Sequence, residues 1–142
     1  METSDLMALG EAALASQPFS RFLGAELHAF APGSAELRLP VRPELLQQHG
    51  FVHGGVLGYL ADNALTFAGG SALGPAVVTA EYVMSYLRPA RGETLVARAT
   101  VLSAGKRRAV CRCDVFAVAG GEETLCAAAQ GTIARLGEES GE

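Results

Sequence analysis

The stretch GGVLGYLADNALTFAGGSA, residues 54–72, decides the fold. It is apolar on nearly every side and contains no proline, a pattern typical of a buried helix rather than a surface helix. Small residues recur along it and leave its surface thin, so that a sheet can pack close; they are Gly54, Gly55, Gly58, Ala61, Ala64, Ala68 and Gly69. The stretch therefore predicts one long central helix.

The segments on either side of this helix predict two strands before it and four long strands after it. Residues 3–16 have the apolar spacing of a short amphipathic helix, which we expect to end at Pro18. The strands are expected at 22–30, 34–41, 76–87, 93–103, 107–119 and 123–136, with a loop at 40–52 and turns at 31–34, 89–92, 104–106 and 120–122. We expect the last four strands to form a meander. The order predicts an α+β domain in which one helix lies across an antiparallel sheet.

The length and composition fit a single domain. The chain has 142 residues, with no repeat or linker, so residues 1–142 are expected to form one domain with a helical segment at 1–18 and a flexible tail at 137–142. Apolar residues make up 49% of the chain, which is enough for a core. Charged residues make up only 18%, which suggests additional buried surface such as a subunit interface.

Charge and targeting signals exclude several classes of partner. The net charge is −4 and no basic tail is present, so a nucleic-acid partner is not expected. The first eleven residues carry acids and lack the basic start and apolar core of a signal peptide. The stretch 54–80 is interrupted by Asp62, Asn63 and Pro75, which argues against a membrane span. We therefore expect a cytoplasmic protein that does not enter a membrane.

The cysteines and histidines do not form a recognisable metal site. Cys111, Cys113 and Cys126 contain no CxxC pair, so we expect small buried thiols in a reducing compartment. His49 and His53 are four residues apart, as in some zinc sites, but Gly50 and the glycines that follow His53 disfavour a helical pair, and zinc needs further ligands. No Gly-x-Ser-x-Gly or phosphate-binding loop is present. No metal and no resident cofactor are therefore expected.

Asp62 is the one charged residue between His53 and Glu81, and it lies inside the predicted buried helix. An unpaired carboxylate there is costly, so Asp62 needs a partner or a ligand. Two interpretations remain open from this feature alone. Asp62 is either a functional acid or a helix carboxylate that local donors such as Asn63 or Thr66 satisfy.

The triplet His53-Gly54-Gly55 stands at the start of the same helix. The first turn of a helix presents unpaired N–H groups and partial positive charge, and glycine lets a substrate approach the backbone closely. An oxyanion hole for acyl transfer can be built in this way, although a plain loop-to-helix junction would look the same.

The spacing between these two features suggests a site made by two chains. Nine residues at 100° each put Asp62 on the side of the helix opposite position 53, and roughly 13 Å along its axis. One helix cannot easily bring both groups to one carbonyl. Two copies of the helix that run antiparallel across a two-fold axis can, in two equivalent sites.

Several motifs together resemble a known family. They are QQHGFVHGG at 47–55, LADNA at 60–64, VTAEY at 78–82, YLRPA at 86–90 and Gly92-Glu93. Over residues 20–136 the chain resembles the hotdog-fold thioesterases of the phenylacetate-degradation (PaaI) type. The resemblance implies a hotdog fold, dimers or dimers of dimers (a homotetramer), and hydrolysis of acyl-CoA thioesters without a metal.

The resemblance also implies roles for individual residues. Gly54 matches the glycine whose N–H polarises the thioester carbonyl, and Asp62 matches the catalytic acid. His53 matches a histidine that organises the loop, and Thr79 matches a hydroxyl residue that helps place the attacking water. Gln47 matches the polar residue six positions before the histidine. Gly55 and Glu81, which lie in the matching motifs, are expected to contact substrate.

Gln47 and Asp62 combine features of two branches of this family. Many members of the PaaI type have Asn where this chain has Gln47. Relatives that act on hydroxybenzoyl thioesters, the 4-hydroxybenzoyl-CoA thioesterases, have Gln there but usually carry Glu in place of Asp62. The acyl preference is therefore left open.

Two turns hold nearly half of the eleven Lys and Arg residues. The resemblance implies that the CoA nucleotide binds near these turns, where cations would pair with its phosphates. Without the resemblance they would be interpreted as solvated turn charges. The residues expected to bind CoA are Arg88, Pro89, Ala90 and Arg91 in one turn and Gly105, Lys106, Arg107 and Arg108 in the other.

The leading hypothesis is hydrolysis of acyl-CoA to a free acid and CoA. The Gly54 N–H would stabilise the oxyanion, and Asp62 of the partner subunit would act as general base or nucleophile. A hotdog acyl-CoA hydratase or dehydratase and a non-catalytic acyl-CoA-binding module are the alternatives. CoA enters all three hypotheses as part of the ligand.

Overall fold

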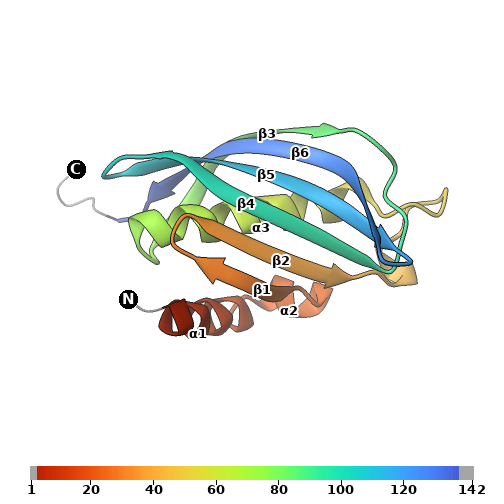
Figure 1. The fold of residues 1–142 in the computed structure, drawn as a ribbon, viewed down its shortest axis with the longest axis horizontal. Coiled ribbons are helices and arrows are strands. Elements are labelled where there is room, and N and C mark those ends of the chain that lie inside the picture. The colour runs from red at the N-terminus through yellow and green to blue at the C-terminus, as the bar shows by residue number, and fades with distance from the viewer. Residues whose placement is uncertain (1–2, 138–142) are drawn as a thin grey trace.

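The computed structural model of the chain describes residues 3–137, so the tail expected at 137–142 lies outside the described residues except for Gly137. The chain forms a six-stranded antiparallel sheet in the order β1-β2-β4-β5-β6-β3, with one long helix against it (Figure 1). The elements are α1 (Thr3–Ala15), α2 (Pro18–Leu23), β1 (Glu26–Ala31), β2 (Ser34–Pro40), the 3-10 helix η1 (Pro43–Leu45), α3 (Gly54–Leu73), β3 (Val77–Tyr86), β4 (Thr94–Ala104), β5 (Arg108–Ala119) and β6 (Glu122–Arg135).

The small residues of α3 let the sheet approach it closely, as the sequence predicts. Ala61, Ala64 and Ala68 are fully buried. A Cβ at Gly69 would lie 2.7 Å from the Cβ of Ile133 on β6, so only glycine fits at this contact. The helix is therefore held in the core by shape as well as by its apolar character. Within residues 3–137, no helix is long and apolar enough to cross a membrane.

The strand expected at 22–30 is wrong in its first part. Pro18 begins the short helix α2 instead of only ending α1, because the fixed φ of proline suits the first turn of a helix. Gly24 ends α2 with a φ of 91°, and β1 starts at Glu26. The Arg42 side chain donates hydrogen bonds to the carbonyls of Phe22 and Leu23 and so satisfies the end of this helix.

The expected four-strand meander is also wrong, because β3 pairs with β6 and not with β4. Only β4, β5 and β6 follow one another as a meander. The segment 87–93 crosses the end of the sheet over three strand spacings, roughly 14 Å. A two- to five-residue hairpin cannot make this connection. The consequence is that β3 lies at an edge of the sheet.

A β-bulge in β3 decides which of its side chains face α3. The pairing of β3 with β6 shifts register between Thr79 and Glu81. Thr79 before the bulge and Tyr82 after it both lie half-buried, although an unbroken strand would put them on opposite faces. Gly131 on β6 makes room for the bulge, because a Cβ there would lie 2.6 Å from the Glu81 carbonyl oxygen.

Candidate active site

The Asp62 carboxylate, half-buried on α3, is held by a strand of the sheet. The Thr79 hydroxyl on β3 donates to Asp62 Oδ1 over 2.6 Å, and the Thr66 hydroxyl lies 2.9 Å from that of Thr79. The local donors considered from sequence do not reach the carboxylate. Thr66 donates to the main-chain carbonyl of Asp62, and Asn63 donates to Gln17, Ser20 and Tyr59. No described residue donates to Oδ2, so this oxygen is open to a ligand.

His53 caps the N-terminus of α3 with its side chain. Its Nδ1 accepts a hydrogen bond from the Gly55 N–H over 2.8 Å, so the neutral ring carries its proton on Nε2. A Cβ at Gly55 would lie 3.0 Å from this Nδ1, so glycine makes the close approach possible. The cap also means that the Gly55 N–H, expected to contact substrate, is occupied by His53.

The Gly54 N–H is the unpaired donor of this helix end. The Val56 N–H is bonded to the His53 carbonyl, whereas the Gly54 N–H has no acceptor among residues 3–137. A free N–H at a helix N-terminus is suited to stabilising an oxygen that gains negative charge. The N–H predicted to stabilise the oxyanion is therefore free to donate a hydrogen bond to a ligand.

The loop before α3 is fixed by its own hydrogen bonds and by the Arg-Pro-Ala turn. The Val52 N–H donates to the Ala90 carbonyl, and the His53 N–H donates to the Leu45 carbonyl. The Arg91 guanidinium lies 4.4 Å from the centre of the Phe51 ring. The first cationic turn therefore lies beside the loop that precedes α3, at the same end of the sheet (Figure 1).

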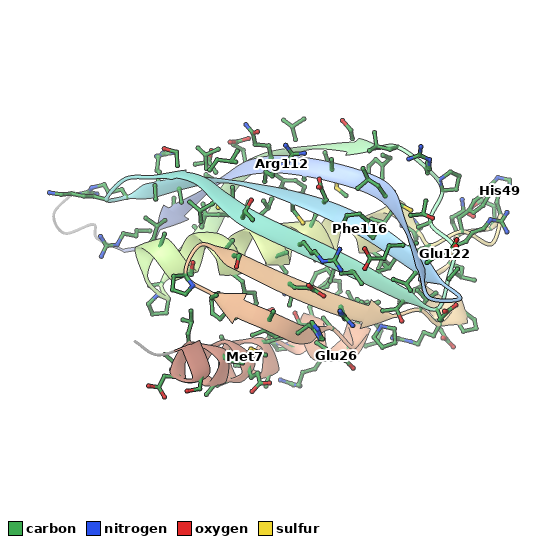
Figure 2. All side chains as sticks on the ribbon, viewed as in Figure 1. Met7, Glu26, His49, Arg112, Phe116 and Glu122 are labelled. Atoms are coloured by element: carbon green, nitrogen blue, oxygen red, sulfur yellow. The ribbon has the colours of Figure 1, made fainter. Side chains whose placement is uncertain are left out.

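Two predicted site residues have structural partners that the sequence did not indicate. The Gln47 amide oxygen accepts hydrogen bonds from the backbone N–H groups of His49 and Phe51 and so closes its own loop. Glu81 faces away from α3 because of the bulge, and it accepts a hydrogen bond from the Thr132 hydroxyl over 2.6 Å. His49 is exposed on this loop at the far end of the molecule (Figure 2).

Tyr82 and Tyr86 contact α3 between Gly54 and Asp62, an arrangement that the sequence analysis did not predict. The Tyr86 hydroxyl donates to the Gly54 carbonyl over 3.1 Å, and the Tyr82 hydroxyl donates to the Gly58 carbonyl over 3.4 Å. Burial raises the pKa of Tyr82, and the negative charge of Asp62 and the nearby Tyr86 raise it further. Their spacing of four on a strand indicates a shared face, which is the signal that could have found them.

Thiol and metal chemistry have little support among the described residues. Cys111, Cys113 and Cys126 are buried and unpaired, and burial raises the pKa of Cys111 to about 11 and that of Cys113 to about 12. Thiols with such pKa values carry little thiolate at neutral pH. Within residues 3–137, no three His, Cys, Asp or Glu side chains gather closely enough to hold a metal ion.

The two cationic turns lie at opposite ends of the sheet. Arg88 and Arg91 precede β4, whereas Lys106 and Arg107 follow it, and the eleven residues of β4 separate the turns by roughly 33 Å. The Lys106 carbonyl accepts a hydrogen bond from the Arg135 side chain, which fixes the second turn. One CoA nucleotide cannot contact both turns of a single chain.

Comparison with known proteins identifies the family of this fold and site. A family model described as "Thioesterase superfamily" matches residues 49–124, more than half of the chain. The chain belongs to this superfamily. The chain is accordingly a thioesterase.

Solved structures agree with this assignment. A thioesterase family protein from Silicibacter pomeroyi has 32% sequence identity and a TM-score of 0.86, with coverage of 95% of this chain and 98% of that one. The PaaI protein from the phenylacetic acid degradation operon of E. coli has 26% identity and a TM-score of 0.84, over 95% and 96% of the two chains. The hotdog fold and the α+β class predicted from the sequence are confirmed.

A curated relative points to the same type. The acyl-coenzyme A thioesterase PaaI of Escherichia coli strain K12 is 35% identical over 92 residues, which cover 64% of this chain and 65% of that protein. The resemblance to the PaaI type drawn from the motifs is therefore confirmed at the level of the family.

Proposed function

We propose that the protein hydrolyses acyl-CoA thioesters to a free acid and CoA. The observation that carries the proposal is the pair of open groups on α3, the Gly54 N–H and the Asp62 carboxylate held by Thr79. The acyl-coenzyme A activity named for the E. coli relative supports the CoA thioester as the substrate.

The roles follow from the chemistry of the two groups. Asp62 Oδ2 takes a proton from water while the water oxygen attacks the thioester carbonyl carbon. The carbonyl oxygen becomes an oxyanion and accepts a hydrogen bond from the Gly54 N–H. The C–S bond then breaks, and CoA leaves as a thiolate that regains the proton. Alternatively Asp62 attacks the carbonyl carbon itself, and water hydrolyses the resulting anhydride.

Each site is proposed to use two subunits. Gly54 and Asp62 are eight residues apart on one straight helix, which separates them by about 12 Å. Strand β3 supports the dimer because its outer edge has no strand partner within the described chain, and Val83 on this strand is 71% exposed. A second copy paired antiparallel at this edge would bring the two α3 helices side by side in opposite directions.

The separation of the cationic turns fits the same dimer. If one CoA nucleotide contacts both turns, then Arg88 and Arg91 come from one subunit and Lys106 from its partner. The two Arg side chains, beside the loop that precedes α3, would pair with phosphate oxygens in a bidentate manner, whereas Lys106 would act as a point charge. Replacement of Lys106 by Glu should raise KM for an acyl-CoA more than for the same acyl group on a short thiol. Equal effects on both substrates would remove this turn from the CoA site.

A substrate panel tests the proposed activity. Acetyl-, butanoyl-, decanoyl- and phenylacetyl-CoA should be assayed for released thiol, with a crotonyl-CoA hydration assay in parallel. We expect the wild type to release thiol from at least one acyl-CoA. The Asp62→Asn variant should not release thiol from the same substrate. Hydration of crotonyl-CoA without thiol release from any thioester would reassign the site to a hydratase.

A further inference from the structure

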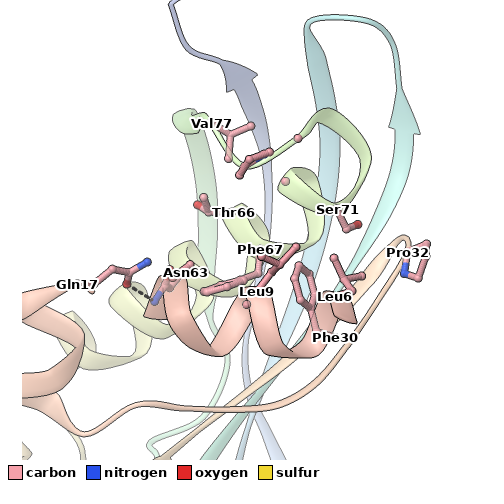
Figure 3. Close-up of a pocket in the computed structure, with 15 residues that line it drawn as sticks. Leu6, Leu9, Gln17, Phe30, Pro32, Asn63, Thr66, Phe67, Ser71 and Val77 are labelled. Carbon is pink, nitrogen blue, oxygen red and sulfur yellow. Dashed lines mark hydrogen bonds between the residues drawn. The ribbon is translucent and has the colours of Figure 1, made fainter. Parts of the chain in front are cut away.

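An apolar groove of about 570 Å³ separates α1 from α3 (Figure 3). This volume lies within the range of about 300–1,000 Å³ that is usual for small-molecule sites. No charged side chain is among its lining residues in the described chain, and its few polar atoms belong to Gln17, Asn63, Thr66 and Ser71. The groove is therefore suited to an uncharged, mainly hydrocarbon ligand.

The groove is long and narrow because one row of residues along α1 and one along α3 form its two sides. On α3 and its C-cap residue the lining positions run from Asn63 to Gly74 at spacings of three and four residues, a stripe about 17 Å long. On α1 they run from Leu6 to Ala13 with the same spacing. The two helices run in opposite directions, since Gln17 just after α1 accepts a hydrogen bond from Asn63 over 3.1 Å, whereas Leu6 near the start of α1 lies toward Ser71 (Figure 3). An extended chain fits this shape better than a single ring.

Two hydrogen-bonded threonines link the groove to Asp62. Thr66 lines the groove, and its hydroxyl contacts Thr79, which donates to Asp62 Oδ1. Val77 also lines the groove and lies two residues before Thr79 on the same face of β3. A thioester carbonyl at Asp62 can therefore extend its acyl group past Thr66 between α1 and α3.

A partly buried polar cluster holds the wall of the groove in place. Ser20 is 1% exposed, and its hydroxyl accepts a hydrogen bond from Tyr59 over 2.6 Å and donates to Gln17 over 2.5 Å. Asn63 donates to all three side chains. The cluster joins the end of α1 and the start of α2 to α3, so it fixes the distance between the two sides of the groove.

We propose that this groove binds the acyl chain of the substrate and makes the enzyme selective for an extended aliphatic acyl group of medium or greater length. The inference rests on the proposed function, because it places the acyl tail relative to Asp62. Helix α1, with its exposed Leu9 at the rim, is then the element that sets the chain-length preference.

Two neighbouring alanines of α1 provide a matched pair of variants. Ala13 lines the groove, whereas Ala12 is exposed on α1 and does not line it. Ala13→Trp should fill the groove and Ala12→Trp should not, although both carry the same new side chain on the same helix. In the wild type, each buried methylene should raise kcat/KM by roughly three- to fourfold until the groove is filled. Decanoyl-CoA should therefore exceed butanoyl-CoA by at least about 10-fold.

The expected result is that Ala13→Trp abolishes the preference for decanoyl-CoA over butanoyl-CoA, and that Ala12→Trp keeps the wild-type preference. If Ala13→Trp fails to fold, Leu9→Gln at the rim should lower the ratio of kcat/KM for decanoyl-CoA to kcat/KM for butanoyl-CoA. The inference is overturned if the wild type shows no preference for decanoyl-CoA, or if both tryptophan variants have the same chain-length profile.

A binding measurement separates this inference from the proposed function. The fluorescence of cis-parinaric acid, a fatty acid, should rise with wild type and Ala12→Trp, and its affinity should fall at least about 10-fold with Ala13→Trp. Equal affinity for the two variants, or no binding to the wild type, contradicts the groove as the site. If the wild type binds cis-parinaric acid as expected but hydrolyses no acyl-CoA, the proposed activity alone is contradicted.

Discussion

The two groups on α3 that are proposed to act in catalysis, one at its N-terminus and one two turns further on, are positioned in different ways. At the N-terminus the working group is a main-chain N–H, and His53, Gly54 and Gly55 define it within three residues. Two turns further on, the working group is the Asp62 side chain, and its hydrogen-bond donor Thr79 comes from a strand that follows the helix. The first end is local and depends on backbone geometry, whereas the second depends on the packing of β3. Substitutions can therefore damage each end separately.

The largest effect should come from removing the acid while its shape is kept. Asp62→Asn retains an oxygen for Thr79 but cannot take a proton, so kcat should fall by about 100-fold to 10,000-fold. Asp114→Asn, on the exposed face of β5 and paired with Arg112, is the control and should retain wild-type turnover. A folded Asp62→Asn enzyme with near wild-type kcat would remove Asp62 from the chemistry.

Removing the main-chain donor should cost nearly as much. Gly54→Pro deletes the N–H at the first position of α3, where proline is favoured, and His53 already has the extended backbone (φ −59°, ψ 136°) that precedes proline. We expect kcat to fall by about 100-fold to 1,000-fold with unchanged helix content by circular dichroism. Gly54→Ala keeps the N–H, and its Cβ would lie an acceptable 3.4 Å from Tyr86, so it should retain most activity. An equal loss of kcat in both variants would indicate that steric crowding at position 54, and not the missing N–H, lowers the activity.

The smallest effect should come from changing Thr79, the residue that positions the Asp62 carboxylate. Thr79→Val removes the hydroxyl that donates to Asp62 and keeps the shape of the side chain, so kcat should fall by roughly 10-fold. Thr79→Ser keeps the donor and should stay within about twofold of wild type. If Val and Ser variants had the same kcat, the hydroxyl would not position Asp62.

The same contrast explains what the sequence could predict. The central helix and the place of HGG at its start are local patterns, and both were predicted from apolar spacing, glycine content and the resemblance. The position of β3 at the sheet edge depends on long-range pairing with β6, and no local signal separates this arrangement from a meander. The bulge that brings Thr79 and Tyr82 to α3 depends on Gly131, which lies about fifty residues along the chain.

The cationic turns show a related limit. Their charges are evident from the sequence, but the distance between them depends on the length and direction of β4. Likewise, α2 was missed because Pro18 is equally consistent with the end of one helix and the start of another. The groove beside α1 was beyond prediction because it depends on how α1 packs against β1 while it stays apart from α3.

The central claim is that one active site takes Gly54 from one subunit and Asp62 from the other. Asp62→Ala and Gly54→Pro subunits, each nearly inactive alone, should be unfolded together, refolded as a mixture and assayed. A mixed dimer has one site with both defects and one with neither, so random pairing should restore about one quarter of wild-type activity. Formation of mixed dimers should be verified with distinguishable tags and mass spectrometry. If mixed dimers form and the activity remains at the level of the single variants, both groups act within one chain and the account is contradicted.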